Sequence, residues 1–428
     1  MKVGFLSIDN QTVDIKTARM ALFDSGHSAD IFVTVEPSGI DGALSMLRAA
    51  CDAIVIDGNV DAFYEKYKET LFNRPNHFDF DGKLHSITPK ADSEYLTERF
   101  LPQLGQRVKK RYAVMLFKTY GKTVDELKTM LKEYMNKKSK VQFGFFEDLL
   151  ECEVHARCST NIAKDDMNKI SERLVELLGG CTYAYEDISI NRRVAQILRA
   201  EKLKLKIAES FTGGALGTAF TSVPGASDYL VEDVVTYSVM SKNKRLGVPL
   251  ATIAEKGVVS GDTAYSMALG LMTSGDCDIA IATTGNAGPT AQSGAPGLCY
   301  VALGITSQKS IAVIKYMFNG DRDYNIKCGV KNAMFLLYES LISYRRQKQR
   351  QMAAAAQQQA QQQAQQAAQQ AAQQAQQAQQ AMQQQVQQVM QQQAQQPAQP
   401  QQSQQVTFTT PIAPFAPTIV SSNDETDD

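Results

Sequence analysis

From Gln351 to about Gln405 the chain consists almost entirely of Gln and Ala, which restricts the structures open to its last part. Both residues are good helix formers, and no proline occurs before Pro397, so the segment can continue a preceding helix without a break. Small or apolar residues recur at steps of 4 and 3 from Ala360 to Val389, a period of about 3.67 residues that matches a straight α-helix. The alternative is a low-complexity repeat that is partly disordered and has no specific role.

The charges of the remaining chain are nearly balanced. All 44 Lys and Arg residues lie in residues 1–350, together with 41 of the 45 Asp and Glu residues, which leaves a net charge of +3. A near-neutral body argues against direct nucleic-acid binding, which needs an excess of cations. No apolar run approaches the roughly 18 residues of a membrane span. The start of the chain is typical of a first strand and not of a secretion signal.

Cysteine and histidine usage limits the chemistry. The seven cysteines include no Cys-x-x-Cys pair, which disfavours the common zinc and dithiol sites and fits reduced thiols in the cytoplasm. The four histidines all lie in the first 155 residues. A Ser-His-acid triad is therefore excluded within the second half of the chain.

Alternating strand and helix patterns predict an α/β, multi-domain chain. We expect a reduced α/β domain over residues 1–75 and a linker over 76–108, where polar residues and prolines are frequent. A small α+β domain is expected over 109–182 and a larger α/β domain over 186–350. Residues 351–428 form the Gln/Ala-rich tail, whose Pro-rich and acidic end we expect to be disordered.

A candidate nucleophile follows a predicted strand in the largest domain. The strand Leu205–Glu209 ends at Ser210, and Gly213 and Gly214 open a predicted helix. Glycine lets the backbone turn tightly, and the free N–H groups of a helix start suit an anion or a developing oxyanion. Ser and Gly are also ordinary residues at a helix cap, so this segment alone leaves both interpretations open.

A nucleophilic serine needs a base, and a lysine made neutral by burial can replace histidine. Lys242 follows a predicted strand that carries Tyr237 near its end. Lys242 could equally be a solvated lysine beside Lys244 and Arg245, and Tyr237 a half-buried strand residue.

Two further loops leave strands in the same domain. One runs from Thr283 to Pro289, and the other leads to Arg322. In open α/β sheets, ligands bind beyond the carboxyl ends of the strands, so we expect these loops to converge with Ser210. Arg322 could bind a phosphate bidentately or pair with the neighbouring Asp321 or Asp323.

These residues together resemble the carboxy-terminal domain of the CinA family, the nicotinamide-nucleotide amidase also called nicotinamide mononucleotide deamidase. The resemblance covers about 160 residues, with several separate motifs in the same order as in the family. The matching segments are Ser210–Gly214, Ser222–Ser227, Val234–Ser238, Lys242, Gly285–Pro289 and Phe318–Arg322.

The resemblance implies a mechanism and a set of site residues. Ser210 would attack the carboxamide carbon of nicotinamide mononucleotide, Lys242 would act as the base, and Tyr237 would assist proton transfer. Ammonia and nicotinate mononucleotide would be the products, in pyridine-nucleotide salvage, with no metal and no organic cofactor. Arg322 would meet the substrate phosphate. The substrate-binding residues implied are Thr212, Gly213, Gly214, Thr284, Gly285, Asn286, Gly288 and Arg322.

The other domains show weaker resemblances. The middle unit is similar to the KH-like domain of full-length CinA proteins over Phe117–Gly121 and Glu153–Arg157, but it lacks a Gly-x-x-Gly clamp for RNA. The first unit stands where the family has a molybdopterin-binding-like domain. Its phosphate-binding glycines are replaced by Ser7–Asn10 and Asp57–Asp61, so we expect no pyrophosphatase activity and a role in packing or dimer contacts.

The amidase unit also departs from the family pattern. Phe211 stands where the family has a cysteine after the serine, and we expect it to narrow the pocket. Asn286 replaces an isoleucine, and a lysine of the family is missing around Gly294–Gly297. We expect a cytoplasmic homo-oligomer that acts on a small nucleotide substrate, without membrane or nucleic-acid partners. Two alternatives remain, a catalytically silent CinA-like binding or scaffold protein that oligomerises and, less favoured, a DNA-repair accessory protein.

Overall fold

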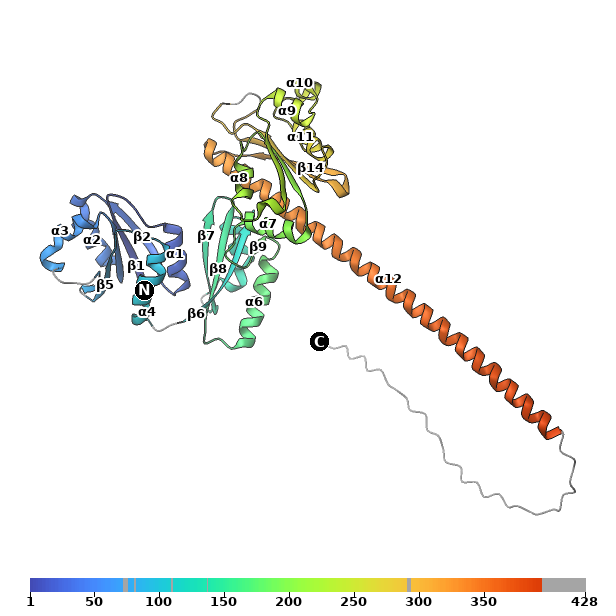
Figure 1. Ribbon diagram of the computed structural model, residues 1–428. Coiled ribbons are helices and arrows are strands. Elements are labelled where there is room, and N and C mark those ends of the chain that lie inside the picture. The colour runs from blue at the N-terminus through green and yellow to red at the C-terminus, as the bar shows by residue number, and fades with distance from the viewer. Residues whose placement is uncertain (72–75, 81, 109–110, 137, 291–293, 395–428) are drawn as a thin grey trace, which may run out of the picture. The chain divides into compact units, whose positions relative to one another are not determined.

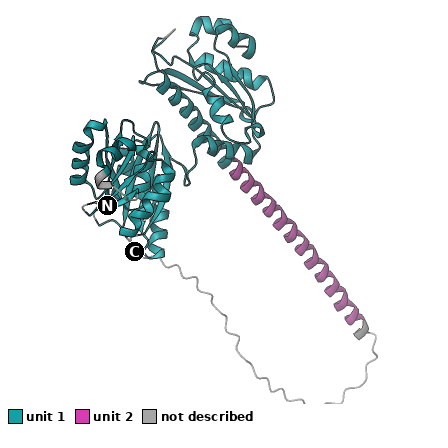
Figure 2. Cartoon of the chain, turned by 60° about the vertical axis from the view of Figure 1, so that its left-hand side comes forward, with its two compact units in different colours: residues 1–347 teal, residues 348–428 magenta. Residues whose placement is uncertain are grey.

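The computed structural model describes residues 1–71, 76–80, 82–108, 111–136, 138–290 and 294–394. The chain divides into two compact units, residues 1–347 and 348–428 (Figure 2). Within the described residues, the first unit contains three separate sheets with accompanying helices (Figure 1). The predicted α/β, multi-domain fold is therefore confirmed.

The first sheet has the strand order β2-β1-β3-β5-β4, with β4 antiparallel and the others parallel. Apolar side chains of β1 and β3 are fully buried between helices on both faces, as expected for a parallel sheet. The strands are β1 (Lys2–Ile8), β2 (Ser28–Val35), β3 (Ala53–Gly58), β4 (His77–Phe80) and β5 (Lys83–Ile87). The helices are α1 (Ile15–Asp24), α2 (Ile40–Ala50), α3 (Val60–Leu71) and α4 (Leu101–Arg107), with the short 3-10 helix η1 (Pro37–Gly39) and the π-helix η2 (Tyr95–Phe100).

The predicted linker over 76–108 is wrong. Its described residues contain β4, β5, η2 and α4, and thus complete the first domain. Leu84, Leu96, Phe100 and Leu104 are buried in the core beneath the sheet. The prolines misled the prediction, because Pro102 occupies the first turn of α4, where a helix tolerates proline.

The second sheet is antiparallel, in the order β7-β8-β6-β9, and confirms the predicted α+β unit. One face is covered by α5 and α6 around Phe117, Val154 and Leu174. The strands are β6 (Tyr112–Tyr120), β7 (Val141–Asp148), β8 (Glu151–Ser159) and β9 (Thr182–Ala184). The helices are α5 (Val124–Met130) and α6 (Lys164–Leu178), with the turn η3 (Lys132–Tyr134).

Charged residues alternate with core residues along β8 and contact α1 of the first domain. Glu153 pairs with Lys16 at 2.8 Å, and His155 Nδ1 lies 2.7 Å from Asp24. Arg157 donates to the backbone oxygen of Phe23. The face of the second sheet that carries these charges is thus joined to the first domain by partly buried polar contacts.

The charge of His155 makes this contact depend on pH. Burial opposes the charged imidazole, but hydrogen bonds to Asp24 and Glu153 raise the pKa of His155 to about 9. Because the folded pKa lies above the unfolded value, the stabilisation is complete below about pH 6.5 and is lost as pH rises through about 9. We expect unfolding experiments between pH 6 and 10 to show a loss of at most about 3 kcal/mol that His155→Asn reduces. His77→Asn is the control, since burial lowers the pKa of His77; an unchanged pH dependence in His155→Asn would contradict this account.

The third sheet has the order β11-β10-β12-β13-β14. The first three strands pair in parallel, and β13 pairs antiparallel with both β12 and β14. One face packs on α11 and the other on α7, α8 and α12. The strands are β10 (Leu205–Glu209), β11 (Leu230–Val235), β12 (Ile279–Gly285), β13 (Leu298–Ile305) and β14 (Ser310–Met317). The helices are α7 (Ile190–Glu201), α8 (Ala215–Thr221), α9 (Val239–Leu246), α10 (Leu250–Lys256), α11 (Gly261–Thr273) and α12 (Arg322–Ala394), with the turns η4 (Ala226–Asp228) and η5 (Thr306–Gln308).

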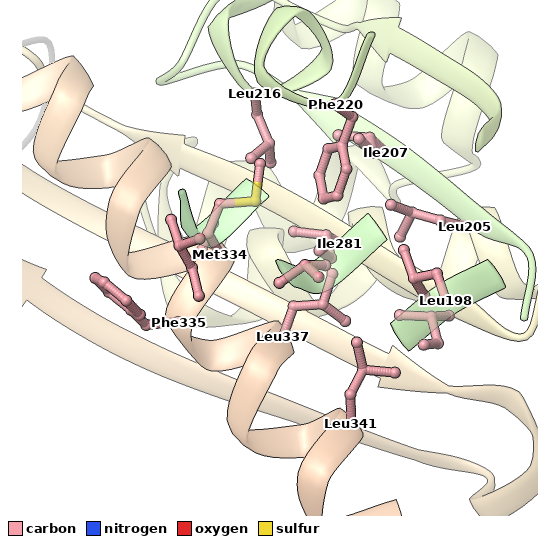
Figure 3. Packing of buried hydrophobic residues seen from close by; sticks show 14 of the residues in the cluster. Leu198, Leu205, Ile207, Leu216, Phe220, Ile281, Met334, Phe335, Leu337 and Leu341 are labelled. Carbon is pink, nitrogen blue, oxygen red and sulfur yellow. The ribbon is translucent and has the colours of Figure 1, made fainter. Parts of the chain in front are cut away.

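The part of α12 from Met334 to Leu341 closes the core of this domain. Met334, Leu337 and Leu341 face the sheet residues Ile281 and Leu205 in Figure 3. All five side chains are buried. This spacing of three and four residues places one face of the helix against the sheet.

We expect Leu337→Ala to lower the free energy of unfolding by about 3 kcal/mol, because it removes a fully buried side chain and leaves a cavity. Urea denaturation of the full chain would measure the change. Leu336→Ala, at a partly buried position on the same turn, should cost less. Equal losses for the two variants would contradict the packing described here.

The same helix continues through the Gln/Ala segment to Ala394, as the helix-forming composition predicts. The predicted end at Pro397 and the Pro-rich, acidic segment lie outside the described residues. No helix in the described part of the chain is long and apolar enough to cross a membrane.

Candidate active site

Three loops meet at the carboxyl ends of β11, β10 and β12, which are neighbours in the third sheet. Ser210 follows β10, Tyr237 follows β11, and Thr284 lies at the end of β12. They line one cavity of about 380 Å³, as expected for a site beyond parallel strand ends. The other lining residues are Phe211, Ser238, Val239, Val258, Val259, Gly285, Asn286, Ala287, Thr290 and Arg322.

Lys242 reaches Ser210 from helix α9. Ser238 caps this helix by accepting a hydrogen bond from the N–H of Ser241, and Lys242 follows within its first turns. The side chain of Lys242 is 0% exposed, and its Nζ lies 2.9 Å from Ser210 Oγ. The surface alternative for Lys242 is therefore wrong.

The burial of Lys242 makes a neutral amine, which can accept a proton, accessible near neutral pH. Burial lowers the pKa of Lys242 to about 8. Its Nζ also donates to the backbone oxygens of Thr236, at 2.7 Å, and Tyr237, at 3.2 Å. A neutral amine has two N–H donors, which these oxygens accept, so its lone pair is left for the hydroxyl proton of Ser210. This arrangement can activate a serine without histidine.

Tyr237 contacts the Ser210–Lys242 pair only through its backbone oxygen, which accepts a hydrogen bond from Lys242 Nζ. Its side chain lines the cavity but is 64% exposed. The half-buried alternative is therefore wrong for Tyr237, and the role of its phenol in proton transfer stays a prediction.

Arg322 is fixed at another part of the cavity wall. Its guanidinium donates to the backbone oxygen of Gly288 at 2.9 Å. Asn325 holds the same region by donating to the oxygens of Ala287 and Gly320, both at 2.9 Å. Arg322 thus presents a positive charge to the cavity. Gly288 does not line the cavity, but its backbone oxygen holds the Arg322 guanidinium in place.

The sequence predicted that free N–H groups at the start of α8 would bind an anion. This prediction is wrong for three of them, because Glu209 already accepts their hydrogen bonds. The carboxylate of Glu209 accepts from the N–H groups of Gly214, Leu216 and Gly217 at 2.9, 3.2 and 2.6 Å. Those donors are therefore satisfied from inside the protein. Thr212, Gly213 and Gly214 do not line the cavity, and Thr212 instead hydrogen-bonds Thr283 at 2.8 Å.

Phe211 belongs to both the core and the cavity wall. Its side chain is buried and packs near Phe318. A Cβ atom at Gly285 or Gly329 would lie 2.5 or 2.7 Å from the Phe211 ring. The two glycines therefore make room for the ring that stands at the position of the family's cysteine.

Several site residues escaped the sequence analysis. Val258 and Val259, which precede α11, line the cavity, but valine side chains give no chemical signal of a site. Thr284 donates to the backbone oxygen of Val258 at 2.9 Å. Glu209 carried a usable signal, because an acidic residue at the end of a buried strand needs nearby donors.

Comparison with known proteins identifies the family to which the chain is similar. The family model of the CinA C-terminal domain matches residues 187–341. A CinA-like protein from Geotalea uraniireducens is 30% identical over 331 residues, which cover 73% of this chain and 76% of the relative. A CinA-like protein from Geobacter sulfurreducens is 40% identical over 148 residues, 35% of this chain and 36% of the relative.

Two further matches have different coverage. A relative from Caldicellulosiruptor saccharolyticus is 29% identical over 272 residues, which cover 62% of this chain and 66% of the relative. The crystal structure of a competence-damaged protein (CinA) superfamily protein from Klebsiella pneumoniae is 33% identical, covers 36% of this chain and 96% of that chain, and has a TM-score of 0.35.

Proposed function

Since the chain belongs to the CinA family, we propose that it is a cytoplasmic amidohydrolase that converts nicotinamide mononucleotide to nicotinate mononucleotide and ammonia, in pyridine-nucleotide salvage. The observation that carries the proposal is the 2.9 Å contact between Oγ of Ser210, which lines the cavity, and Nζ of the buried Lys242.

The first half of the reaction forms an ester. Ser210 Oγ attacks the carboxamide carbon of the substrate while its proton passes to Lys242. The tetrahedral intermediate then expels ammonia, which takes this proton from Lys242. Two backbone oxygens hold the amine in place throughout, so little reorganisation is required at the moment of transfer.

The second half hydrolyses the ester. Lys242, neutral again, accepts a proton from water, and the resulting hydroxide attacks the acyl carbon. Nicotinate mononucleotide leaves as Ser210 recovers its proton. In this scheme Arg322 binds the substrate phosphate, and its position at the wall of the same cavity supports that role.

Ammonia release tests this function directly. Purified full-length chain mixed with nicotinamide mononucleotide should release one ammonia for each nicotinate mononucleotide formed. The silent-scaffold hypothesis predicts binding of the nucleotide by calorimetry without release of ammonia. That outcome would contradict the proposed function, and so would failure to bind the nucleotide at all.

A further inference from the structure

Glu209, which precedes Ser210, is hydrogen-bonded to the start of helix α8, which follows Ser210. Glu209 is 0% exposed, and its two carboxylate oxygens accept the N–H groups of Gly214, Leu216 and Gly217. These bonds close the turn around Ser210, from the end of β10 to the beginning of α8. The orientation of Ser210 toward Lys242 therefore depends on the carboxylate of Glu209.

The bonds also indicate the charge of Glu209. Three N–H donors need acceptor lone pairs, and an ionised carboxylate offers more of them than a protonated one. Buried backbone N–H groups that lose their acceptor are costly, so the ionised form is favoured by these contacts.

A second carboxyl group lies against this charge. Asp233 of β11 pairs in register with Ile207 of β10, and a Cβ atom at Gly217 would lie only 1.8 Å from Asp233 Oδ2. Asp233 Oδ1 is buried and has no hydrogen-bond partner among the described residues. Two adjacent ionised carboxylates in such a space repel each other, so the state in which one of them carries a proton is favoured.

The surroundings assign that proton to Asp233. Burial, followed by the charge of Glu209 and a hydrogen bond to it, raises the pKa of Asp233 to about 7. Glu209 is the charged group that acts on Asp233 here, and the nearest cation along β10, Lys206, contacts Glu232 at 3.8 Å. Gly217, from α8, presents only backbone to the carboxyl group.

We propose that Glu209 and Asp233 form a carboxyl pair that shares one proton and positions Ser210 for attack, with Glu209 ionised and Asp233 neutral. The inference rests on the proposed function and deepens it. Both are positioning residues, because they hold the turn from its inner side and do not line the cavity. Ionisation of Asp233 would bring a second negative charge beside Glu209. It would weaken the hydrogen bonds from the backbone N–H groups to Glu209 that hold the turn.

Two variants of the full-length chain test the pair. In Asp233→Asn, the amide resembles a neutral carboxyl group and can donate to Glu209, so we expect kcat within about threefold of the original at pH 7. Glu209→Gln places an amide N–H against backbone donors, so we expect kcat to fall about 100-fold, with KM changed less than about threefold. An unchanged kcat in Glu209→Gln would overturn the proposal.

The pH profile separates positioning from a general loss of stability. Lys242 titrates in both the original chain and Asp233→Asn, so its effect cancels in the ratio of their kcat values. Because only the original chain can ionise Asp233, we expect the ratio of Asp233→Asn to original to rise between pH 6 and 9. This measurement decides the matter even if Glu209→Gln does not fold. A flat ratio would contradict a neutral Asp233.

Labelling with a fluorophosphonate, which reacts with activated serines, gives a readout that does not need the natural substrate. The labelling rate of Ser210 should fall about 100-fold in Glu209→Gln and remain within about threefold in Asp233→Asn. If the original chain is labelled but releases no ammonia, the proposed function fails and the positioning role still stands. Equal labelling of the original chain and Glu209→Gln would overturn the positioning role whatever the substrate is.

Discussion

Ser210→Ala is expected to lower the rate of ammonia release from nicotinamide mononucleotide by at least about 1,000-fold. The variant removes the only atom that forms the ester in the proposed mechanism, while the cavity and the charge of Arg322 remain. Substrate binding should therefore change little, and the loss should appear in kcat. Coupled detection of ammonia, together with calorimetry of nucleotide binding, measures both quantities.

Ser222→Ala is the matched control for this variant. Ser222 ends the helix that follows Ser210, is exposed, and donates to the backbone oxygen of Ala219 outside the cavity. It should retain the original kcat. Ammonia release by Ser210→Ala at the control rate would remove Ser210 from the mechanism.

The second large effect is expected at Lys242. The reactive form is the neutral amine, and burial lowers the pKa of Lys242 to about 8. The value of kcat should therefore fall about tenfold for each pH unit below 8 and level off above it. Lys242→Met keeps an unbranched side chain, one atom shorter, that has no base, so kcat should drop by at least about 1,000-fold and lose this pH dependence.

Lys244→Met provides the comparison for Lys242→Met. Lys244 lies on the same helix but is exposed and does not line the cavity. It should keep both the rate and the pH profile of the original chain. A Lys242→Met variant with the original pH profile would show that another group is the base.

The helices and strands whose formation depends mainly on local sequence could be predicted. The parallel strands near Ser210 have short apolar runs, and the extension of α12 to Ala394 follows from helix formers uninterrupted by proline. The pairing of Ser210 with Lys242 came from residue types and from the resemblance to a family. The structure adds the distance and the burial that make the pairing chemically meaningful.

The features that escaped prediction depend on contacts between distant residues. Residues 76–108 resemble a linker because polar residues and prolines are frequent there. In the structure, β5 from this segment pairs in parallel with β3 of the first sheet. The contact between Asp24 and His155 joins residues 131 positions apart. The position of Glu209 at the end of a buried strand signals that it needs donors, but local sequence does not show which donors it meets. Only the structure shows that they are N–H groups at the start of α8.

Covalent labelling is the most direct test of the central claim that Ser210 is a nucleophile activated by Lys242. The full-length chain is treated with a fluorophosphonate, digested, and mapped by mass spectrometry, with and without nicotinate mononucleotide. The account predicts a single adduct on Ser210 that forms much more slowly in Lys242→Met and is suppressed by the nucleotide. An adduct on a different residue, or one that forms on Ser210 equally fast without Lys242, would contradict it.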